Sequence, residues 1–174
     1  MSASKFEAQL LEINSWTIVH VPSDVSDALP SRGLVMVRGL INGLGFQVAL
    51  EPDGRKGHWF ELEADMLKKL NVVVGDTVKC TIEPTKDWVE PKVPKDILDG
   101  LQADAPAFAQ WQNCTTMARW EWIRWIRATN RAETRAHHIV VACSKLRGGA
   151  RRPCCFNASM CTVPEVSKNG VLAY

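Results

Sequence analysis

The sequence predicts an α+β protein, with a small closed β-barrel of six strands followed by a C-terminal helical module. Short segments of alternating apolar and polar residues, which are typical of strands, recur through residues 5–84. Turn signals separate these segments at regular spacing, as expected for a small barrel, and closure would remove their exposed edges. Beyond residue 95, apolar residues recur every three or four positions, which indicates amphipathic helices.

Alternation and turn residues place the elements of the barrel. Asn42-Gly43 lies between two strand-like runs and predicts a tight hairpin, because a type I′ turn needs positive φ at both central positions. Ser23 stands where a helix N-cap belongs, so we expect a short helical turn over residues 24–29. A second short helix is expected over residues 63–70. The expected strands are residues 5–13, 16–21, 34–40, 45–50, 58–62 and 77–83.

The rest of the chain divides by composition into a linker, a helical module and a tail. Residues 85–95 are rich in proline and charge, which predicts a linker leaving the barrel domain of residues 5–84. Residues 96–149 form the predicted helical module, which begins with short helices over residues 96–101 and 106–111. Residues 150–174 show no periodicity, so we expect an irregular tail.

Residues 119–146 predict two consecutive amphipathic helices that join at Thr129 and Asn130. At about 100° per residue, Trp122 and Trp125 project to the apolar side of the first helix. Arg124 projects to the other side, together with Trp120, which leaves this tryptophan to stack on the arginine or to serve as an exposed ligand platform.

The second helix of this pair has its own start and stop signals. Asn130 and Glu133 have the spacing of a capping box at its start. Ala132, Ala136, Ile139, Cys143 and Leu146 then follow in one apolar row, and Gly148-Gly149 predicts the end.

The net charge of +2 conceals an asymmetry along the chain. Residues 1–118 carry 11 Lys and Arg against 16 Asp and Glu, whereas residues 119–152 carry 9 against 2. A sign change of this kind indicates an anionic partner for the basic segment. The alternative is that the basic helices dock on the acidic barrel. Net charge gives information about association but does not distinguish these two partners.

Two sets of short motifs mark the two parts of the chain. In the N-terminal half they are residues 16–22, Val37-Arg38-Gly39 with Ile41-Asn42-Gly43, Pro52-Asp53-Gly54 with Gly57-His58, and Gly75-Asp76-Thr77-Val78. By these motifs, this half resembles the bacterial and archaeal domain of unknown function numbered 1905. After residue 124 they are Trp125-Ile126, Ala128 and Glu133-Thr134-Arg135. By these motifs, this segment resembles the YdeI/OmpD-associated family, also called bacteriocin-protection. Together the two resemblances cover about residues 5–150.

The resemblance implies a barrel of the double-split-barrel kind followed by a helical module. It implies no established activity, and the family name suggests a role in envelope stress. The N-terminus shows no apolar segment or cleavage site of a secretory signal, and no apolar run is long enough to cross a bilayer, so we expect a cytoplasmic protein without membrane insertion. Phosphate-loop, dinucleotide and zinc-protease motifs are missing, and we expect no cofactor.

Two groups of residues are candidates for ligand binding. At the barrel mouth, His58 and Trp59 follow a glycine-flanked basic loop, and Arg38 and Asn42 complete a possible enzyme site. A histidine without a matched nucleophile is more often structural. In the helical module the candidates are Trp120, Arg124, Arg131 and Arg135, of which the last two could cradle an anion at a helix start. Alternatively, Glu133 pairs with these arginines.

The cysteines give a third and weaker hypothesis. Six cysteines in a cytosolic chain are expected to remain thiols. Cys154, Cys155 and Cys161 could nevertheless form a zinc or redox site with a histidine, although adjacent cysteines fit a closed tetrahedron poorly.

Three functions therefore remain open. The first is a non-enzymatic binding or stress-associated accessory protein that recognises an anionic ligand or protein partner through the basic helical module; nucleic acid is possible but not favoured. The second is a small enzyme with its site at the barrel mouth. The third is a zinc- or redox-responsive regulator that uses the cysteine-rich tail.

Overall fold

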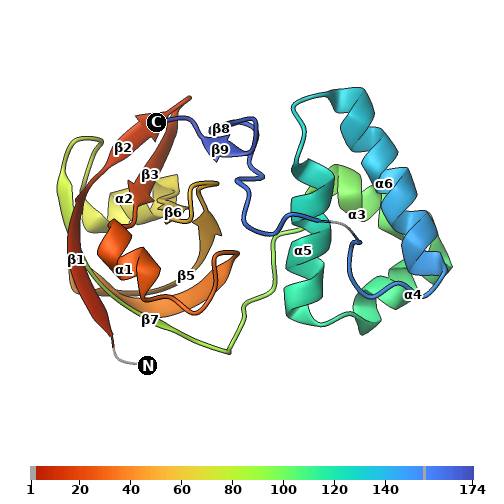
Figure 1. Cartoon of the computed structure of the whole chain (residues 1–174), viewed down its shortest axis with the longest axis horizontal. Helices are drawn as coiled ribbons and strands as arrows, with labels where there is room; N and C mark the ends of the chain where they lie inside the picture. Colours follow the sequence, from red (N-terminus) through yellow and green to blue (C-terminus); the bar gives the residue numbers. More distant parts are fainter. Residues whose placement is uncertain (1–2, 155) are drawn as a thin grey trace. The chain divides into compact units, whose positions relative to one another are not determined.

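The structure, a computed structural model, describes residues 3–154 and 156–174, and this part of the chain forms two compact units (Figure 1). The first unit comprises the chain up to Asp87 with residues 158–161 and 165–174, and the second comprises residues 88–157 and 162–164. The first contains strands β1 (Ser4–Gln9), β2 (Leu11–Ile13), β3 (Trp16–His20), β4 (Val35–Ile41), β5 (Leu44–Pro52), β6 (His58–Glu61) and β7 (Thr77–Pro84), helices α1 (Ser23–Asp27) and α2 (Ala64–Leu70), and the short strands β8 (Ser167–Lys168) and β9 (Val171–Leu172).

The main sheet of the first unit is antiparallel and curled, with the strand order β1-β7-β4-β5-β6-β3-β2 among the described residues (Figure 1). The α+β class is confirmed, but the predicted closed barrel of six strands is wrong. The expected first strand divides at Leu10 into β1, which pairs with β7, and β2, which pairs with β3. Leu10 itself exchanges backbone hydrogen bonds with the turn at Gly75 and Asp76. The chain bends at this residue, so β1 and β2 become the two opposite edge strands of the sheet.

The β4–β5 hairpin confirms the strongest turn signal of the sequence. Asn42 and Gly43 both adopt positive φ, at 47° and 82°, and the flanking residues pair in register from Ile41↔Leu44 to Val35↔Leu50. The inward side chains of the sheet form one apolar core, on which α2 packs through Met66, Leu67 and Leu70. Burial of this core provides the main stabilising term of the unit.

The second unit is helical and contains α3 (Lys95–Gln102), α4 (Ala105–Asn113), α5 (Thr116–Arg127) and α6 (Ala132–Arg147). Asp104 caps α4 by accepting a hydrogen bond from Ala107 N, and Thr115 caps α5 by accepting one from Ala118 N. The apolar faces of the helices meet in a second core, which includes Ile97, Trp111 and the fully buried Trp122.

The predicted joint between the last two helices is confirmed in position but not in detail. α5 ends at Arg127 and α6 begins at Ala132, with Arg131 at the N-cap position. The predicted capping box at Asn130 is therefore wrong. Thr129 Oγ1 instead accepts a hydrogen bond from Arg131 N, which holds the turn and moves the helix start by one residue.

The segment after α6 contains some regular structure. Ser167–Lys168 and Val171–Leu172 pair around Asn169 and Gly170, both of which have positive φ. Leu172 N donates to Asp53 O, which ties this hairpin to the loop between β5 and β6. Among the described residues, no helix is long and apolar enough to span a membrane.

Candidate functional site

The residues expected at the barrel mouth take part in contacts within the sheet. Arg38 is exposed on β4 and its Nε donates to Glu83 Oε1 on β7 at 3.1 Å. Asn42 accepts a hydrogen bond from Lys79 N through its side chain, and its own backbone N–H donates to Lys79 O. Both residues thus fasten the β4–β5 hairpin to β7.

His58 and Trp59 lie on β6 and are buried. His58 Nδ1 lies 2.6 Å from Ser26 Oγ, and its Nε2 lies 2.8 Å from Gly33 O. Because a carbonyl oxygen only accepts, Nε2 carries the proton and the Ser26 hydroxyl donates to Nδ1. This is the arrangement of a nucleophile and its base, but both residues have 0 % exposure, so the pair fixes α1 to β6. Trp59 Nε1 donates to Pro52 O at 3.2 Å.

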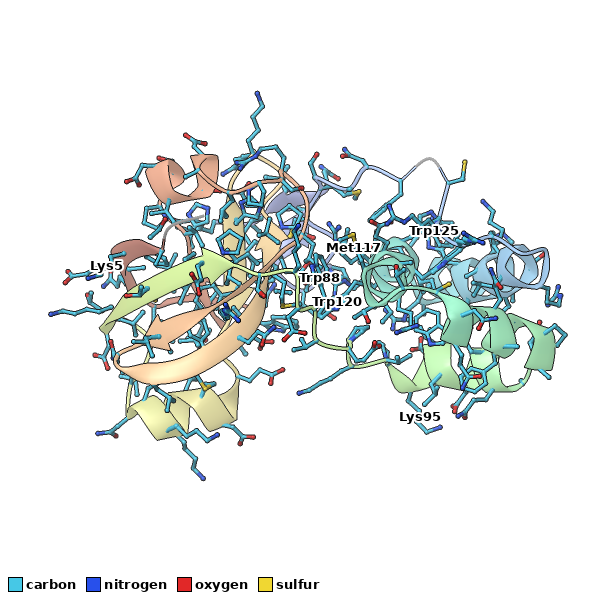
Figure 2. All side chains as sticks on the ribbon, turned by 90° about the horizontal axis from the view of Figure 1, so that it is seen from below. Lys5, Trp88, Lys95, Met117, Trp120 and Trp125 are labelled. Atoms are coloured by element: carbon cyan, nitrogen blue, oxygen red, sulfur yellow. The ribbon has the colours of Figure 1, made fainter. Side chains whose placement is uncertain are left out.

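The structure separates the two helical candidates that the sequence placed together. Arg124, which the sequence places on the side of the helix opposite Trp122 and Trp125, does not stack on Trp120 in the structure. It is 1 % exposed, and its guanidinium carbon lies 5.2 Å from the centroid of the Phe156 ring. Trp120 is half-buried and its Nε1 donates to Val89 O at 2.8 Å. Figure 2 shows Trp120 and Trp125 on different sides of α5, and Trp125 lies against His138 of α6. Helical phasing could not anticipate an apolar partner for Arg124 from a segment 32 positions later.

Arg131 and Arg135 differ in their surroundings. Arg131 is exposed at the start of α6. Arg135 donates through Nε and Nη2 to both carboxylate oxygens of Asp96 on α3, at 2.7 and 3.0 Å. These hydrogen bonds also lower the pKa of Asp96 below its usual range. Arg135 thus pairs with a carboxylate of the neighbouring helix α3.

The cysteines of the zinc and redox hypothesis are only partly described. Cys155 lies outside the described residues, Cys154 is exposed and Cys161 is buried. Within residues 3–154 and 156–174, no group of three or more His, Cys, Asp or Glu side chains is arranged to hold a metal ion.

The strongest candidate for a ligand site is an open cavity of about 720 Å³ in the helical unit, which we call the basic cavity. Its volume falls in the range of small-molecule sites, roughly 300 to 1,000 Å³. It lies where the link from α4 to α5 meets the segment that follows α6. Its lining residues are Gln110, Asn113, Cys114, Thr115, Ala118, Gly149, Arg151 and Arg152.

Hydrogen bonds hold the walls of the basic cavity in place. Gln110 Nε2 on α4 donates to Gly149 O and Ala150 O, at 3.0 and 3.2 Å. Trp122 Nε1 on α5 donates to Arg151 O at 3.2 Å, and the Cys114 thiol donates to the same oxygen at 3.5 Å. The backbone from Gly149 to Arg151 is therefore fixed to α4, to the link between α4 and α5, and to α5, while the Arg151 side chain remains exposed.

The electrostatics of the basic cavity depend on which arginines have carboxylate partners. Arg119 pairs with Glu90, and Arg147 pairs with Asp104, so the charge of both is compensated. Arg151 and Arg152 form no ion pair in the part of the chain that the structure describes; Arg152 Nη2 contacts only Met117 Sδ, at 3.8 Å. Two uncompensated guanidinium groups thus lie at one opening.

The floor of the basic cavity adds two further features. The start of α5 lies here, and the positive end of a helix dipole favours an anion. Burial raises the pKa of the Cys114 thiol, although the nearby Arg119 opposes this effect, so the sulfur stays neutral and adds no competing negative charge.

Sequence reasoning missed the residues that line this cavity. Arg151 and Arg152 belong to the basic segment that the charge pattern identified, but they follow Gly148-Gly149, where the helical pattern ends. Gln110 and Asn113 carry no sequence signal, because amide side chains on a helix usually face solvent. Arg151 and Arg152 stand out only when the arginines that pair with carboxylates are set aside. Those ion pairs join residues distant in the sequence, so the fold is needed to see them.

Comparisons with protein families match both parts of the chain. Residues 6–82 match the domain of unknown function DUF1905. Residues 90–149 match the family described as bacteriocin-protection, YdeI or OmpD-associated. Both matches confirm the resemblances found in the sequence. Among curated proteins, no match is found.

Proposed function

We propose that this chain, whose residues 90–149 match the bacteriocin-protection, YdeI or OmpD-associated family and whose residues 6–82 match DUF1905, is a binding protein for an anionic ligand. The ligand occupies the basic cavity of the helical unit. One observation supports this proposal above the others. Arg151 and Arg152 line a cavity of about 720 Å³, and neither forms an ion pair among the described residues.

The chemistry of the lining favours a ligand with carboxylate or phosphate groups. Guanidinium groups bind such oxyanions through two parallel hydrogen bonds, and they stay protonated at any physiological pH. Asn113 and Thr115 add polar groups at the same opening. The family description mentions bacteriocin protection, and an accessory protein that captures an anionic molecule is compatible with it, but the proposal rests on the cavity.

Calorimetric titration with inorganic tripolyphosphate tests the proposal on the full chain. The double variant R151Q/R152Q should bind at least about tenfold more weakly, because a hydrogen bond to a charged group contributes about 1.5–3 kcal/mol. K68Q/K69Q is the matched control, since it removes the same charge from exposed positions of α2. We expect this control to change the affinity less than about twofold.

Two outcomes would overturn the proposal. Equal affinity of R151Q/R152Q and the wild type would exclude the basic cavity. A loss of affinity in R131Q as large as in the double variant would place the site at the start of α6, as the sequence suggested.

The salt dependence separates a small ligand from nucleic acid. The measurement is the affinity of the full chain for duplex DNA at several salt concentrations. If only Arg151 and Arg152 contact phosphates, the slope of log affinity against log salt is roughly −2, whereas an extended nucleic-acid interface with six or more contacts gives a slope beyond about −5. We expect the shallow slope, and a steep one would favour the nucleic-acid alternative.

A further inference from the structure

The lining of the basic cavity restricts the kind of anion that can bind there. Small-molecule sites are mostly apolar, with a few polar groups that fix the orientation of the ligand. Here, among the described residues of the lining, Ala118 and Gly149 offer only small contacts, and the other side chains are polar. The cavity therefore selects its ligand mainly by hydrogen bonding and charge.

Two of the polar side chains already bond within the walls of the cavity. Gln110 Nε2 donates to Gly149 O and Ala150 O, and the Cys114 thiol donates to Arg151 O. The side chains that remain for a ligand are those of Asn113, Thr115, Arg151 and Arg152.

These remaining side chains all present hydrogen-bond donors. Guanidinium groups only donate, and Asn113 contributes an amide NH₂ group. Thr115 Oγ1 accepts a hydrogen bond from Ala118 N at 3.1 Å, which leaves the hydroxyl proton to donate to a ligand. Oxygens of a ligand thus find partners from several directions.

The lining lacks the groups that would bind a cation or a nucleobase. In the described part of the chain no Asp or Glu lines the cavity, and the carboxylates of Glu90 and Asp104 are engaged in ion pairs. A ligand ammonium group would therefore meet two guanidinium groups and no anion, and like charges repel. No aromatic ring belongs to the described lining, and the Trp122 ring is fully buried, so a base has no surface for stacking.

We propose that the ligand of the basic cavity is a small molecule with two anionic groups and with neither an ammonium group nor an aromatic base, such as a dicarboxylate or a polyphosphate. The inference rests on the proposed function, because it takes this cavity as the anion site. Each guanidinium group binds one anionic group, and Asn113 and Thr115 donate to the remaining oxygens. The hydrogen bonds that fix the backbone at Arg151 lower the cost of ordering the site on binding.

A matched set of ligands tests the inference by calorimetric titration of the full chain. Glutarate carries two carboxylates, glutamate adds an ammonium group to the same skeleton, and butyrate carries one carboxylate on a similar chain. Butyrate and glutamate should bind at least about tenfold more weakly than glutarate. The reasons are that butyrate lacks one charged hydrogen-bond partner and that glutamate brings a like charge to the arginines.

Phosphate ligands form the second arm of the experiment. Pyrophosphate in place of glutarate distinguishes a polyphosphate from a dicarboxylate ligand, and tighter binding of either one supports the inference and identifies the source of the two anionic groups. ATP should bind no more tightly than tripolyphosphate, whereas a stacked base would tighten its binding by about tenfold.

A variant of the lining tests why glutamate is rejected. N113D places a carboxylate in the cavity and so supplies the partner that an ammonium group needs. We expect it to lower the ratio of glutarate affinity to glutamate affinity at least about tenfold. Q112E adds the same charge at the neighbouring exposed position outside the lining, and it should change this ratio less than about twofold.

The outcomes separate this inference from the proposed function. Glutamate or butyrate binding as tightly as glutarate would overturn the inference, as would ATP binding about tenfold more tightly than tripolyphosphate. If R151Q/R152Q abolishes that binding, the proposed function stands without the inference. If R151Q/R152Q binds every probe as the wild type does, or the wild type binds none, the proposed function itself fails.

Discussion

At the scale of single residues, His58 shows how burial can determine the role of a chemically versatile side chain. Its two ring nitrogens are both occupied, by the Ser26 hydroxyl and by Gly33 O, and none of its surface reaches solvent. Burial lowers its pKa and the neighbouring Arg32 acts in the same direction, although the hydrogen bond to Gly33 O opposes them. His58 is thus neutral in the folded protein and joins β6, α1 and the loop before β4.

We therefore predict a large loss of stability in His58→Ala. Removal of a buried ring with two hydrogen bonds should lower the free energy of unfolding by about 3 kcal/mol or more. Urea denaturation followed by circular dichroism measures this value. His137→Ala, at an exposed position of α6, is the control and should stay within about 0.5 kcal/mol of the wild type.

The stability contributed by His58 also depends on pH. Its pKa is lower in the folded state than the value of 6.5 of the unfolded chain, so the unfolded state binds the proton first as the pH falls. The contribution is fully present above about pH 6.5 and is lost as the pH falls below it. Urea titrations of both proteins at several pH values should show the stability difference between the wild type and His58→Ala shrinking below pH 6.5. A constant or growing difference would mean that His58 is charged in the folded state.

At the scale of elements, the pairing of β4 with β7 depends on one glycine. A Cβ at Gly39 would lie 1.7 Å from Thr81 O on β7, so no side chain fits there. Gly39→Ala should lower the free energy of unfolding by at least about 2 kcal/mol, because backbone atoms must shift. Gly45→Ala is a matched control on the paired strand β5, where nothing lies within 4 Å of the added Cβ. Thermal denaturation of the two variants compares them, and equal melting temperatures would contradict the close approach.

Local signals account for most of the elements that the sequence predicted correctly. The Asn42-Gly43 turn follows from the need for positive φ, and the end of α6 at Arg147 follows from Gly148-Gly149. The errors have non-local causes. The expected first strand divides at Leu10 because that residue bonds to the turn at Gly75 and Asp76, which lies 65 residues away.

The candidate site could be predicted from the sequence only as a region. The charge pattern identified residues 119–152 as basic, and Arg151 and Arg152 lie in that segment. Which arginines keep their charge available depends on pairing between helices distant in sequence. Carboxylates 29, 39 and 43 positions away compensate Arg119, Arg135 and Arg147. No periodicity in the sequence encodes these pairs.

At the scale of the whole molecule, the segment after α6 contributes to both units. Residues 158–161 and 165–174 belong to the first unit, and residues 162–164 belong to the second. Four of its described apolar side chains are buried, namely those of Cys161, Val163, Val166 and Leu172. The segment also supplies Arg151 and Arg152 to the basic cavity. A stretch without periodicity in the sequence thus contributes to both units and lines the proposed site.

The most direct test of the central claim is NMR of the arginine Nε–H groups during titration of the full chain with tripolyphosphate. Single R151K and R152K variants assign two of the signals by their disappearance. Binding in the basic cavity predicts that these two signals shift, while those of Arg119, Arg135 and Arg147 stay in place because their carboxylate partners remain. Shifts confined to Arg131, or no shift at Arg151 and Arg152 at saturating ligand, would contradict the proposed function.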